Sequence, residues 1–246
     1  MIAAIFHVHW GYYAPSLLKA GLKTLEFTGA SYVGAIILGF VLALLRISPT
    51  RMARIPAAIY TEIFKNVPLL TWVFIIYYGL SSVGVTLSTF VAGSLSLILF
   101  YAAYLGEIFR AGLQGVPRGQ IEAAQAIGLR RTTTVIHVIM PQALRLSLAG
   151  TATMLVDLLK STSLLVTIAG AELMTQGQII TSVTFRALEV YVVIGAIYFA
   201  LCYPTSQAVL WLERRLQRGD AISLRRRRIL KTVLKLSGDP RTSAEA

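Results

Sequence analysis

Apolar residues occur along this chain in five long runs, separated by shorter polar stretches that carry most of the charge. The runs cover residues 25–45, 57–80, 87–109, 143–168 and 188–212. A helix needs roughly 20 residues to cross the hydrocarbon core of a bilayer, and each run is long enough. The pattern predicts an all-α integral membrane protein with about five transmembrane helices.

Small residues and prolines within the runs predict how these helices pack and bend. Three pairs of small residues in the first and third runs are spaced four apart, as are Ala196 and Ala200 in the fifth run, and such pairs let helices approach closely in lipid. Pro68 removes a backbone hydrogen bond, so we expect a kink or break in the second span, and Pro204 predicts a kink in the fifth. The small pairs are Ala30 with Gly34, Ala35 with Gly39, and Ala102 with Gly106.

Composition supports the membrane assignment. Of 246 residues, 56% are hydrophobic and only 14% are charged, and the mean hydropathy is +0.69. A soluble domain of this size could not bury so much apolar surface. The net charge of +12 raises the question of nucleic-acid binding. The basic residues, however, lie between the apolar runs, which fits membrane topology and predicts no nucleic-acid partner.

The distribution of basic residues predicts the orientation. Cations are dense between the first two spans, between the third and fourth spans, and after residue 212, whereas the other side carries only Lys19, Lys23 and Arg186. The positive-inside rule then places the N-terminus outside and the C-terminus in the cytoplasm. We expect residues 1–22 to form an external or interfacial segment and residues 23–212 the transmembrane domain. Residues 213–246 would form a basic cytoplasmic tail that ends in a disordered polar stretch.

Two pairs of opposite charges, Glu62 with Lys65 and Glu107 with Arg110, lie three residues apart near span ends. This spacing places both members of a pair on one helix face, so we expect each pair to form an ion pair.

A mostly polar interval, residues 115–142, separates the third and fourth spans. Residues 120–127 lack Gly and Pro and predict a short helix, which Gly128 would end by adopting a positive φ. Thr132 or Thr133 would cap a second short helix, and Pro141 suits the first turn of the next one. From the pattern alone, this helix-Gly-helix unit could equally be an ordinary cytoplasmic loop.

The residues of this interval resemble the EAA loop of binding-protein-dependent ABC importer permeases. The run EAAQAIG, residues 122–128, is followed by Ile139, Met140 and Pro141. Four segments in the family's order resemble its polar amino-acid uptake branch, of the histidine/glutamine/arginine permease type: TEIFKNVPLLTWVFIIYYG (61–79), YLGEIFRAGLQGVPRGQIEAAQAIG (104–128), MPQALR (140–145) and LLKSTSL (158–164). The resemblance covers roughly residues 21–212.

This resemblance implies a type I ABC importer permease fold and a bacterial inner (plasma) membrane location. It also implies four kinds of partner: a cytoplasmic ABC ATPase dimer, a second permease that is identical or homologous, an external solute-binding protein, and an amino acid or similar solute. The polar interval would be the loop that couples to the ATPase, from Gln120 to Pro141. Glu122 would make a charge-assisted contact, Ala123 and Ala124 would permit close docking, and Gly128 would set the bend.

No catalytic set is present in the sequence. A phosphate-binding G-x-x-x-x-G-K-[ST] loop is missing, so we expect a non-catalytic subunit without its own cofactor, with ATP bound by the partner. His7 and His9 lack a third metal ligand. The single Cys202 excludes an intramolecular disulfide.

Polar residues in the fourth span are candidates for the substrate path. Gly150, Thr153, Asp157 and Lys160 lie on one helical stripe, followed by Ser161, Thr162 and Ser163. A charge facing lipid would cost about 2.5–3.5 kcal/mol, so the stripe should face protein or water. The candidate path residues are Thr153, Asp157, Lys160, Thr162 and Ser163.

Alternatives remain open at this point. Asp157 and Lys160 could simply neutralise each other. Members of the family usually have Pro-Pro at 149–150, Asn at 153 and Asp at 161, where this chain has Ala-Gly, Thr and Ser. Those differences leave the transported solute undetermined. A secondary transporter or channel subunit would use the same intramembrane charges without an ATPase, and a membrane-embedded enzyme is a weaker alternative.

Overall fold

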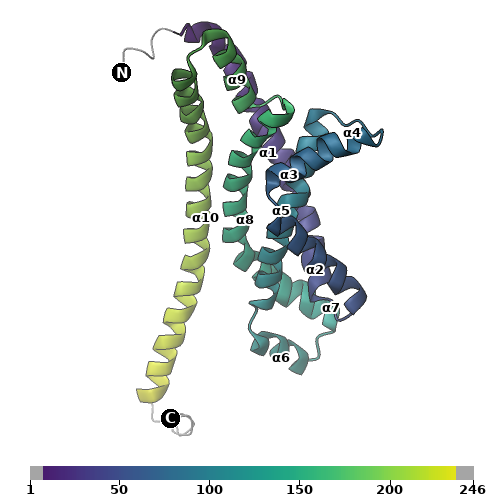
Figure 1. Ribbon diagram of the computed structural model, residues 1–246. Helices are drawn as coiled ribbons and strands as arrows, with labels where there is room; N and C mark the ends of the chain where they lie inside the picture. Colours follow the sequence, from purple (N-terminus) through teal and green to yellow (C-terminus); the bar gives the residue numbers. More distant parts are fainter. Residues whose placement is uncertain (1–7, 237–246) are drawn as a thin grey trace.

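The computed structural model describes the backbone of residues 8–236 and the side chains of residues 8–211 and of Arg215. Over these residues all of the regular secondary structure is helical, and no strand occurs (Figure 1). The α-helices are α1 (Trp10–Ile47), α2 (Arg51–Asn66), α3 (Leu69–Phe74), α4 (Leu80–Ser82), α5 (Thr89–Gln114), α6 (Arg118–Ala126), α7 (Arg131–Thr134), α8 (Met140–Ser161), α9 (Leu173–Thr184) and α10 (Ala187–Leu236). Two π-helical turns, η2 (Ile75–Gly79) and η3 (Val135–Ile139), and a 3-10 helix, η4 (Thr162–Ile168), connect some of them.

Four stretches of helix in the described part of the chain are long and apolar enough to cross a membrane. They are α1, α5, the continuous stretch from α7 through η4, and residues 187–211 of α10; a fifth is obtained if α2 and the bent segment after it count as one span. The prediction of an all-α membrane protein with about five spans is confirmed.

The ends of two spans differ from the sequence-based expectation. Helix α1 begins at Trp10, so residues 10–22, which we expected to be external or interfacial, form its first turns. Tertiary packing explains this, because Leu17 and Ala20 are buried against α9 and α10. Helix α10 continues through Pro204 and beyond residue 212 to Leu236. The polar end of the tail and His7 lie outside the described residues.

The predicted break at Pro68 is confirmed. Val67 is extended, with φ −106° and ψ 132°, because the residue before a proline is excluded from the helical region. The axes of the helices on either side differ by 106°. The predicted ion pair between Glu62 and Lys65 is wrong within the described residues, since the Glu62 carboxylate instead accepts a hydrogen bond of 3.2 Å from the Asn66 side chain.

Helices α1 and α5 form the centre of the molecule, and small residues set their separation. A Cβ atom at Gly39 would lie 2.9 Å from Leu105 Cβ and 3.0 Å from the Ala102 carbonyl oxygen. A Cβ atom at Gly106 would lie 3.3 Å from the Gly39 carbonyl oxygen. The backbones therefore touch at this crossing, as the spacing of Ala35, Gly39, Ala102 and Gly106 predicts. Around it lies a core that includes Phe27, Leu97, Tyr101, Leu105 and Leu158.

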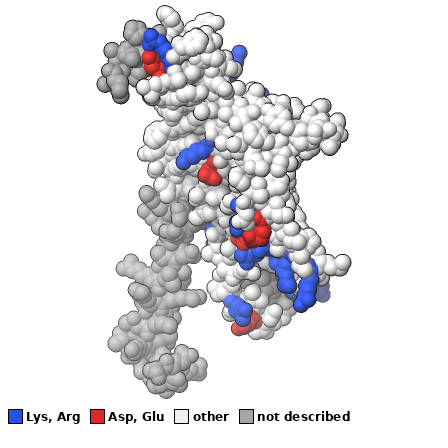
Figure 2. Space-filling model, viewed as in Figure 1, with Lys and Arg blue, Asp and Glu red and all other residues white. Residues whose placement is uncertain are grey.

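Charged side chains are sparse on the apolar surface. The face seen in Figure 2 is mostly white, and its charged atoms gather mainly over the lower end, where α2, α6 and α7 lie in Figure 1. Glu107 on α5 is paired there with Arg110 at 2.6 Å, as predicted, and also with Arg46 of α1 at 2.8 Å. This shared carboxylate ties the end of α1 to α5 just before the polar loop begins.

The opposite end of the molecule is closed by α9, a helix that lies between the fourth and fifth predicted spans. Its N-terminus is capped by Glu172, whose carboxylate accepts hydrogen bonds of 2.7 Å from the backbone N–H groups of Met174 and Thr175. Tyr198 of α10 donates a third, also of 2.7 Å. Burial raises the pKa of the Glu172 carboxyl, because the low-dielectric surroundings disfavour its charged form.

The glycine contact between α1 and α5 generates a stability prediction. Gly39→Val would place side-chain atoms against the α5 backbone, which cannot move aside, and overpacking of this kind costs about 1–3 kcal/mol. We expect a lower thermal unfolding midpoint and a lower yield of monodisperse protein in detergent. Gly29→Val is the matched control, because a Cβ atom at Gly29 of the same helix meets nothing within 4 Å. Equal unfolding midpoints for the two variants would contradict the prediction.

Candidate functional site

The polar loop between α5 and α8 is built around α6, which ends as the sequence predicts. Gly128 has a φ of +76°, the left-handed conformation that favours glycine. Its N–H donates to the Gln125 carbonyl at 2.9 Å, and the Leu129 N–H donates to the Ala124 carbonyl at 3.0 Å. These two bonds form a Schellman motif, which satisfies carbonyl groups at the helix end and reverses the chain direction.

The second half of the loop differs from the prediction. Helix α7 begins directly after Arg130, and Thr132 and Thr133 lie inside it instead of capping it. The Schellman turn explains this, because it delivers Leu129 and Arg130 in position to start a helix at once. Helix α7 then continues through η3 into α8, with Pro141 in the first turn of α8 as predicted. The second short helix is therefore a direct extension of the fourth span.

The structure divides the predicted coupling residues into two groups. Five of these residues are exposed: Gln120, Glu122 and Ala123 on α6, and Gly128 and Pro141 elsewhere in the loop. Ala124 is buried, with only 4% of its surface accessible. The Ala124 side chain is therefore not presented on the surface of α6 in this conformation, and its contribution to docking stays a prediction. Ile127, which the sequence reasoning passed over, is 76% exposed and adds an apolar side chain to the loop surface.

The loop emerges from a tight contact between α5 and α8. A Cβ atom at Gly112 of α5 would lie 2.7 Å from the Ala143 carbonyl oxygen and would overlap the Ser147 hydroxyl. The Ser147 hydroxyl donates to the Ala143 carbonyl at 2.8 Å and also approaches the Ile108 carbonyl at 3.3 Å. Because α5 and α8 touch directly at the root of the loop, a displacement of α6 and α7 would be transmitted to both helices.

The two charges of α8 do not pair with each other. Asp157 accepts a hydrogen bond of 2.7 Å from the Tyr101 hydroxyl of α5, and Ser161 lies 2.7 Å from the same hydroxyl. Among the described side chains, no ion pair links Asp157 to Lys160. The interpretation in which these two residues neutralise each other is therefore wrong. Asp157 and Ser161 border a cavity of about 250 Å³ between α3, α5 and α8.

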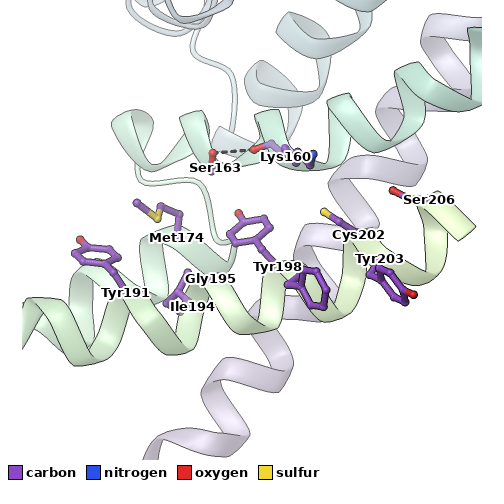
Figure 3. Close-up of a pocket in the computed structure, with 11 residues that line it drawn as sticks. Lys160, Ser163, Met174, Tyr191, Ile194, Gly195, Tyr198, Cys202, Tyr203 and Ser206 are labelled. Carbon is purple, nitrogen blue, oxygen red and sulfur yellow. Dashed lines mark hydrogen bonds between the residues drawn. The ribbon is translucent and has the colours of Figure 1, made fainter. Parts of the chain in front are cut away.

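Lys160 and Ser163 face a different cavity, of about 590 Å³, between α8, α9 and α10. In Figure 3, Tyr198 and Cys202 point from α10 toward Lys160 and Ser163. The Ser163 hydroxyl donates to the Lys160 carbonyl at 2.8 Å. The lining is rich in aromatic side chains, which include Tyr191, Tyr198, Phe199 and Tyr203.

The remaining candidate path residues are placed differently from one another. Thr153 is exposed and its hydroxyl donates to the Ala149 carbonyl of its own helix at 3.0 Å. Thr162 is fully buried and donates to the Leu159 carbonyl at 2.7 Å, so it does not line an open path in this conformation. Tyr101 donates a hydrogen bond to Asp157, and Tyr198 donates one to Glu172. Sequence reasoning missed both tyrosines because nothing in the apolar runs distinguishes them from the other tyrosines there.

The described side chains form no cluster that could hold a metal ion. No three of the His, Cys, Asp and Glu residues within residues 8–211 lie together in a way that could hold a metal. His137 is exposed and its Nδ1 lies 3.2 Å from the Thr133 carbonyl. Cys202 is a buried free thiol.

Comparison with known proteins agrees with this geometry. The chain is 33% identical over 196 residues to the probable glutamine ABC transporter permease protein GlnM of Bacillus subtilis (strain 168), covering 80% of this chain and 91% of that protein. It is 38% identical over 214 residues to the octopine transport system permease protein OccM of Rhizobium meliloti, covering 80% of this chain and 87% of that one.

Solved structures and a family model give the same answer. A chain of the crystal structure of an amino acid ABC transporter with histidines superposes with a TM-score of 0.80 at 33% identity, covering 84% of this chain and 96% of that one. The family model described as "binding-protein-dependent transport system inner membrane component" matches residues 35–218. The chain therefore belongs to the family of inner-membrane permease components of binding-protein-dependent ABC transport systems.

Proposed function

We propose that this chain is the membrane-spanning subunit of an ABC importer that moves amino acids or similar solutes, driven by ATP hydrolysis on separate cytoplasmic subunits. Family membership supports the transport role. The names of the relatives, which include permeases for glutamine, octopine and L-cystine, support the class of solute. One observation supports the coupling role: α6 is exposed, and the loop that contains it leaves α5 and enters α8 where these two helices are in close contact.

Coupling would use the shape of the loop. Helix α6 offers an acid at Glu122 and a small side chain at Ala123, so that another protein surface can approach the helix closely. An ATPase dimer that closes on ATP would push α6, and the Schellman turn would carry this push into α7. Because α7 continues into α8, the displacement would tilt the fourth span and change which side of the membrane the permease opens to.

The path would run along the polar face of α8. Three residues of this helix are exposed, Thr153, Asp157 and Lys160, and Ser163 in the following η4 is partly exposed. Amino acids carry both charges, and an acid and a base in separate cavities offer a partner to each. The path would be completed by a second permease, identical or homologous, and an external binding protein would deliver the solute.

The proposed orientation places α6 in the cytoplasm and α9 outside. The two helices lie at opposite ends of the molecule in Figure 1. The basic residues of the α1–α2 connection and of the polar loop lie at the same end as α6, which the positive-inside rule assigns to the cytoplasm. The location would be the bacterial inner membrane.

Docking of the ATPase on α6 can be tested with Ala123→Arg. A long charged side chain would prevent close approach, and we expect at least about tenfold weaker retention of the ATPase subunit, the effect of roughly 1.4 kcal/mol of docking free energy. The measurement is co-purification of the ATPase with the tagged permease. Ala171→Arg is the matched control, since Ala171 is an exposed alanine near the other end of α8. Equal retention of the ATPase by the two variants would refute docking on this surface. A substitution at the buried Ala124, such as Ala124→Asp, would be less informative, because it would also disturb the packing of the loop.

The mechanical role of the turn predicts a separate phenotype for Gly128→Ala. An alanine held at positive φ is strained by about 1–2 kcal/mol, so the turn should open. We expect faster trypsin cleavage after Arg130 and a lower solute-stimulated rate of ATP hydrolysis, with the ATPase still bound. Gly119→Ala is the control, because Gly119 lies in α6 with open space around it and has no positive φ. A normal stimulated rate in Gly128→Ala would show that the turn is not needed for coupling.

The orientation can be measured with single cysteines placed in a Cys202→Ala background. We expect Ala171→Cys to react with a membrane-impermeant maleimide in intact spheroplasts, and Ala123→Cys to react only after the membrane is permeabilised. The two exposed alanines serve as controls for each other. The reverse pattern would place α6 outside and would make cytoplasmic coupling impossible.

A further inference from the structure

An apolar groove runs between α1 and α10 in the part of the molecule that carries α9. Its volume is about 500 Å³, and the residues that line it are all apolar. Some of them mark its two sides: Trp10, Leu18 and Leu22 of α1, and Val193, Ile197 and Leu201 of α10. Along α1 the lining extends from Trp10 to Leu25, which is about 22 Å of helix and close to the depth of one bilayer leaflet with its headgroups.

The space in the groove is open above Gly21. Gly21 is buried, yet a Cβ atom added there would meet nothing within 4 Å. At Gly39 of the same helix, by contrast, a Cβ atom would lie 2.9 Å from Leu105, because α5 fills that space. Protein interiors are close-packed, so an unfilled groove along two membrane-spanning helices indicates an apolar guest.

A polar cavity of about 430 Å³ lies between the start of α1 and the turn that joins α9 to α10. The polar residues that line it are His9, Tyr12, Tyr13, Thr184 and Arg186. Arg186 continues the face of α10 that borders the groove, since it lies seven residues before Val193 and its carbonyl accepts a helical hydrogen bond of 3.1 Å from the Val190 N–H. On α1, His9 directly precedes Trp10, which lines the groove. The polar cavity and the apolar groove therefore follow each other along the same pair of helices.

Arg186 gives the polar cavity a positive charge that suits a phosphate group. Its side chain is 40% exposed and pairs with Glu189 of α10 at 2.8 Å. A guanidinium group carries five N–H donors in a planar fork that matches the oxygens of a phosphate, so Arg186 can bind a phosphate while Glu189 holds it in place. The hydroxyl groups of Tyr12 and Tyr13 are further hydrogen-bond donors in this cavity.

Two other occupants fit the groove less well than a lipid. A peptide segment would leave its backbone N–H and C=O groups without partners among apolar side chains, which is costly. A second membrane helix packs closely where its neighbour offers small residues, as α1 and α5 do at Gly39 and Gly106. The sides of this groove are instead formed by leucine, valine and isoleucine side chains. A flexible acyl chain can follow such a surface.

We propose that the groove and the polar cavity together bind one phospholipid, with its phosphate at Arg186 and an acyl chain over Gly21. Such a lipid would tie α10 to α1. Only 17% of the apolar span of α10 is buried by the rest of the protein, compared with 56% for α5, so α10 has more to gain from a bound lipid. In the proposed orientation the lipid belongs to the outer leaflet. Binding needs neither ATP nor a transported solute, so this inference does not depend on the import function.

Trp10 can report the bound lipid by its fluorescence. The chain has three tryptophans, so Trp10 is the one that remains in a Trp72→Phe, Trp211→Phe background. The full-length permease in detergent is titrated with phosphatidylglycerol that carries brominated acyl chains, which quench tryptophan on contact, and we expect saturable quenching. Arg186→Gln should raise the half-saturating lipid concentration about tenfold, equivalent to about 1.4 kcal/mol, because the charge-assisted contact to the phosphate is lost. Gly21→Leu should remove the saturable component, because the added side chain fills the groove.

Matched variants separate lipid binding from damage to the fold. Lys19→Gln removes an exposed cation of α1 that lies outside the cavity, and Gly29→Leu adds the same side chain at an exposed glycine of α1 outside the groove. Both variants should bind lipid as the parent does. Arg186→Lys keeps the positive charge and should recover most of the affinity. Where Gly21→Leu yields no monodisperse protein, Ala14→Phe fills the groove from another lining position.

A brominated diacylglycerol, which lacks the phosphate, tests the role of the headgroup. It should need about tenfold more lipid for half-saturation and should be insensitive to Arg186→Gln. Quenching that rises without saturation, or that neither Arg186→Gln nor Gly21→Leu changes, would overturn the site. If Gly21→Leu separates a permease pair that Gly29→Leu leaves intact, measured by size exclusion with light scattering, the groove belongs to a second copy of the chain and the lipid proposal is wrong.

Discussion

The close contact of α1 and α5 at Gly39 and Gly106 is the constraint on which the rest of the fold depends. Lipid gives helices little hydrophobic reason to associate, so membrane helices are held together by close packing and by hydrogen bonds. Contact between backbones at this crossing allows Phe27, Leu97, Tyr101 and Leu105 to interlock around it. The broken helix α2–α3 and helix α8 then pack against α5, so the position of α5 fixes the polar loop and both cavities.

Polar side chains inside this framework link pairs of helices, so that movement of one helix of a pair would act on the other. Glu107 links the ends of α1 and α5 beside the loop, and Glu172 links α9 to α10 at the other end. Tyr101 joins α5 to the polar face of α8 between them. A tilt of α8 would therefore act on Tyr101 and Asp157 in the middle of the molecule. The same helix carries both the predicted coupling motion and the polar groups nearest the path.

The structure and the family match favour an ABC permease subunit over a secondary transporter or a membrane-embedded enzyme. A secondary transporter would use the charges of α8 but would have no need of an exposed helix on a Schellman turn outside the membrane spans. The match to a family of transport components, over residues 35–218, favours a transport subunit over a membrane-embedded enzyme. The matching family shows a permease component of a binding-protein-dependent transport system, and the exposed α6 suits the coupling role proposed for it.

The sequence by itself determined the class, the number of spans, the break at Pro68, the end of α6 at Gly128 and the role of the small residues at the α1–α5 crossing. These features follow from local rules, because proline and glycine restrict or free the backbone and because apolar length decides whether a helix can span lipid. The tertiary structure decided that Ala124 is buried, that α7 is an extension of α8, and that Glu62 pairs with Asn66. It also separated Asp157 from Lys160, since Tyr101, 56 residues earlier in the chain, supplies the partner that sequence spacing assigned to the lysine. Spacing on one helix shows which side chains can meet, but only the packing of neighbouring helices decides which of them do.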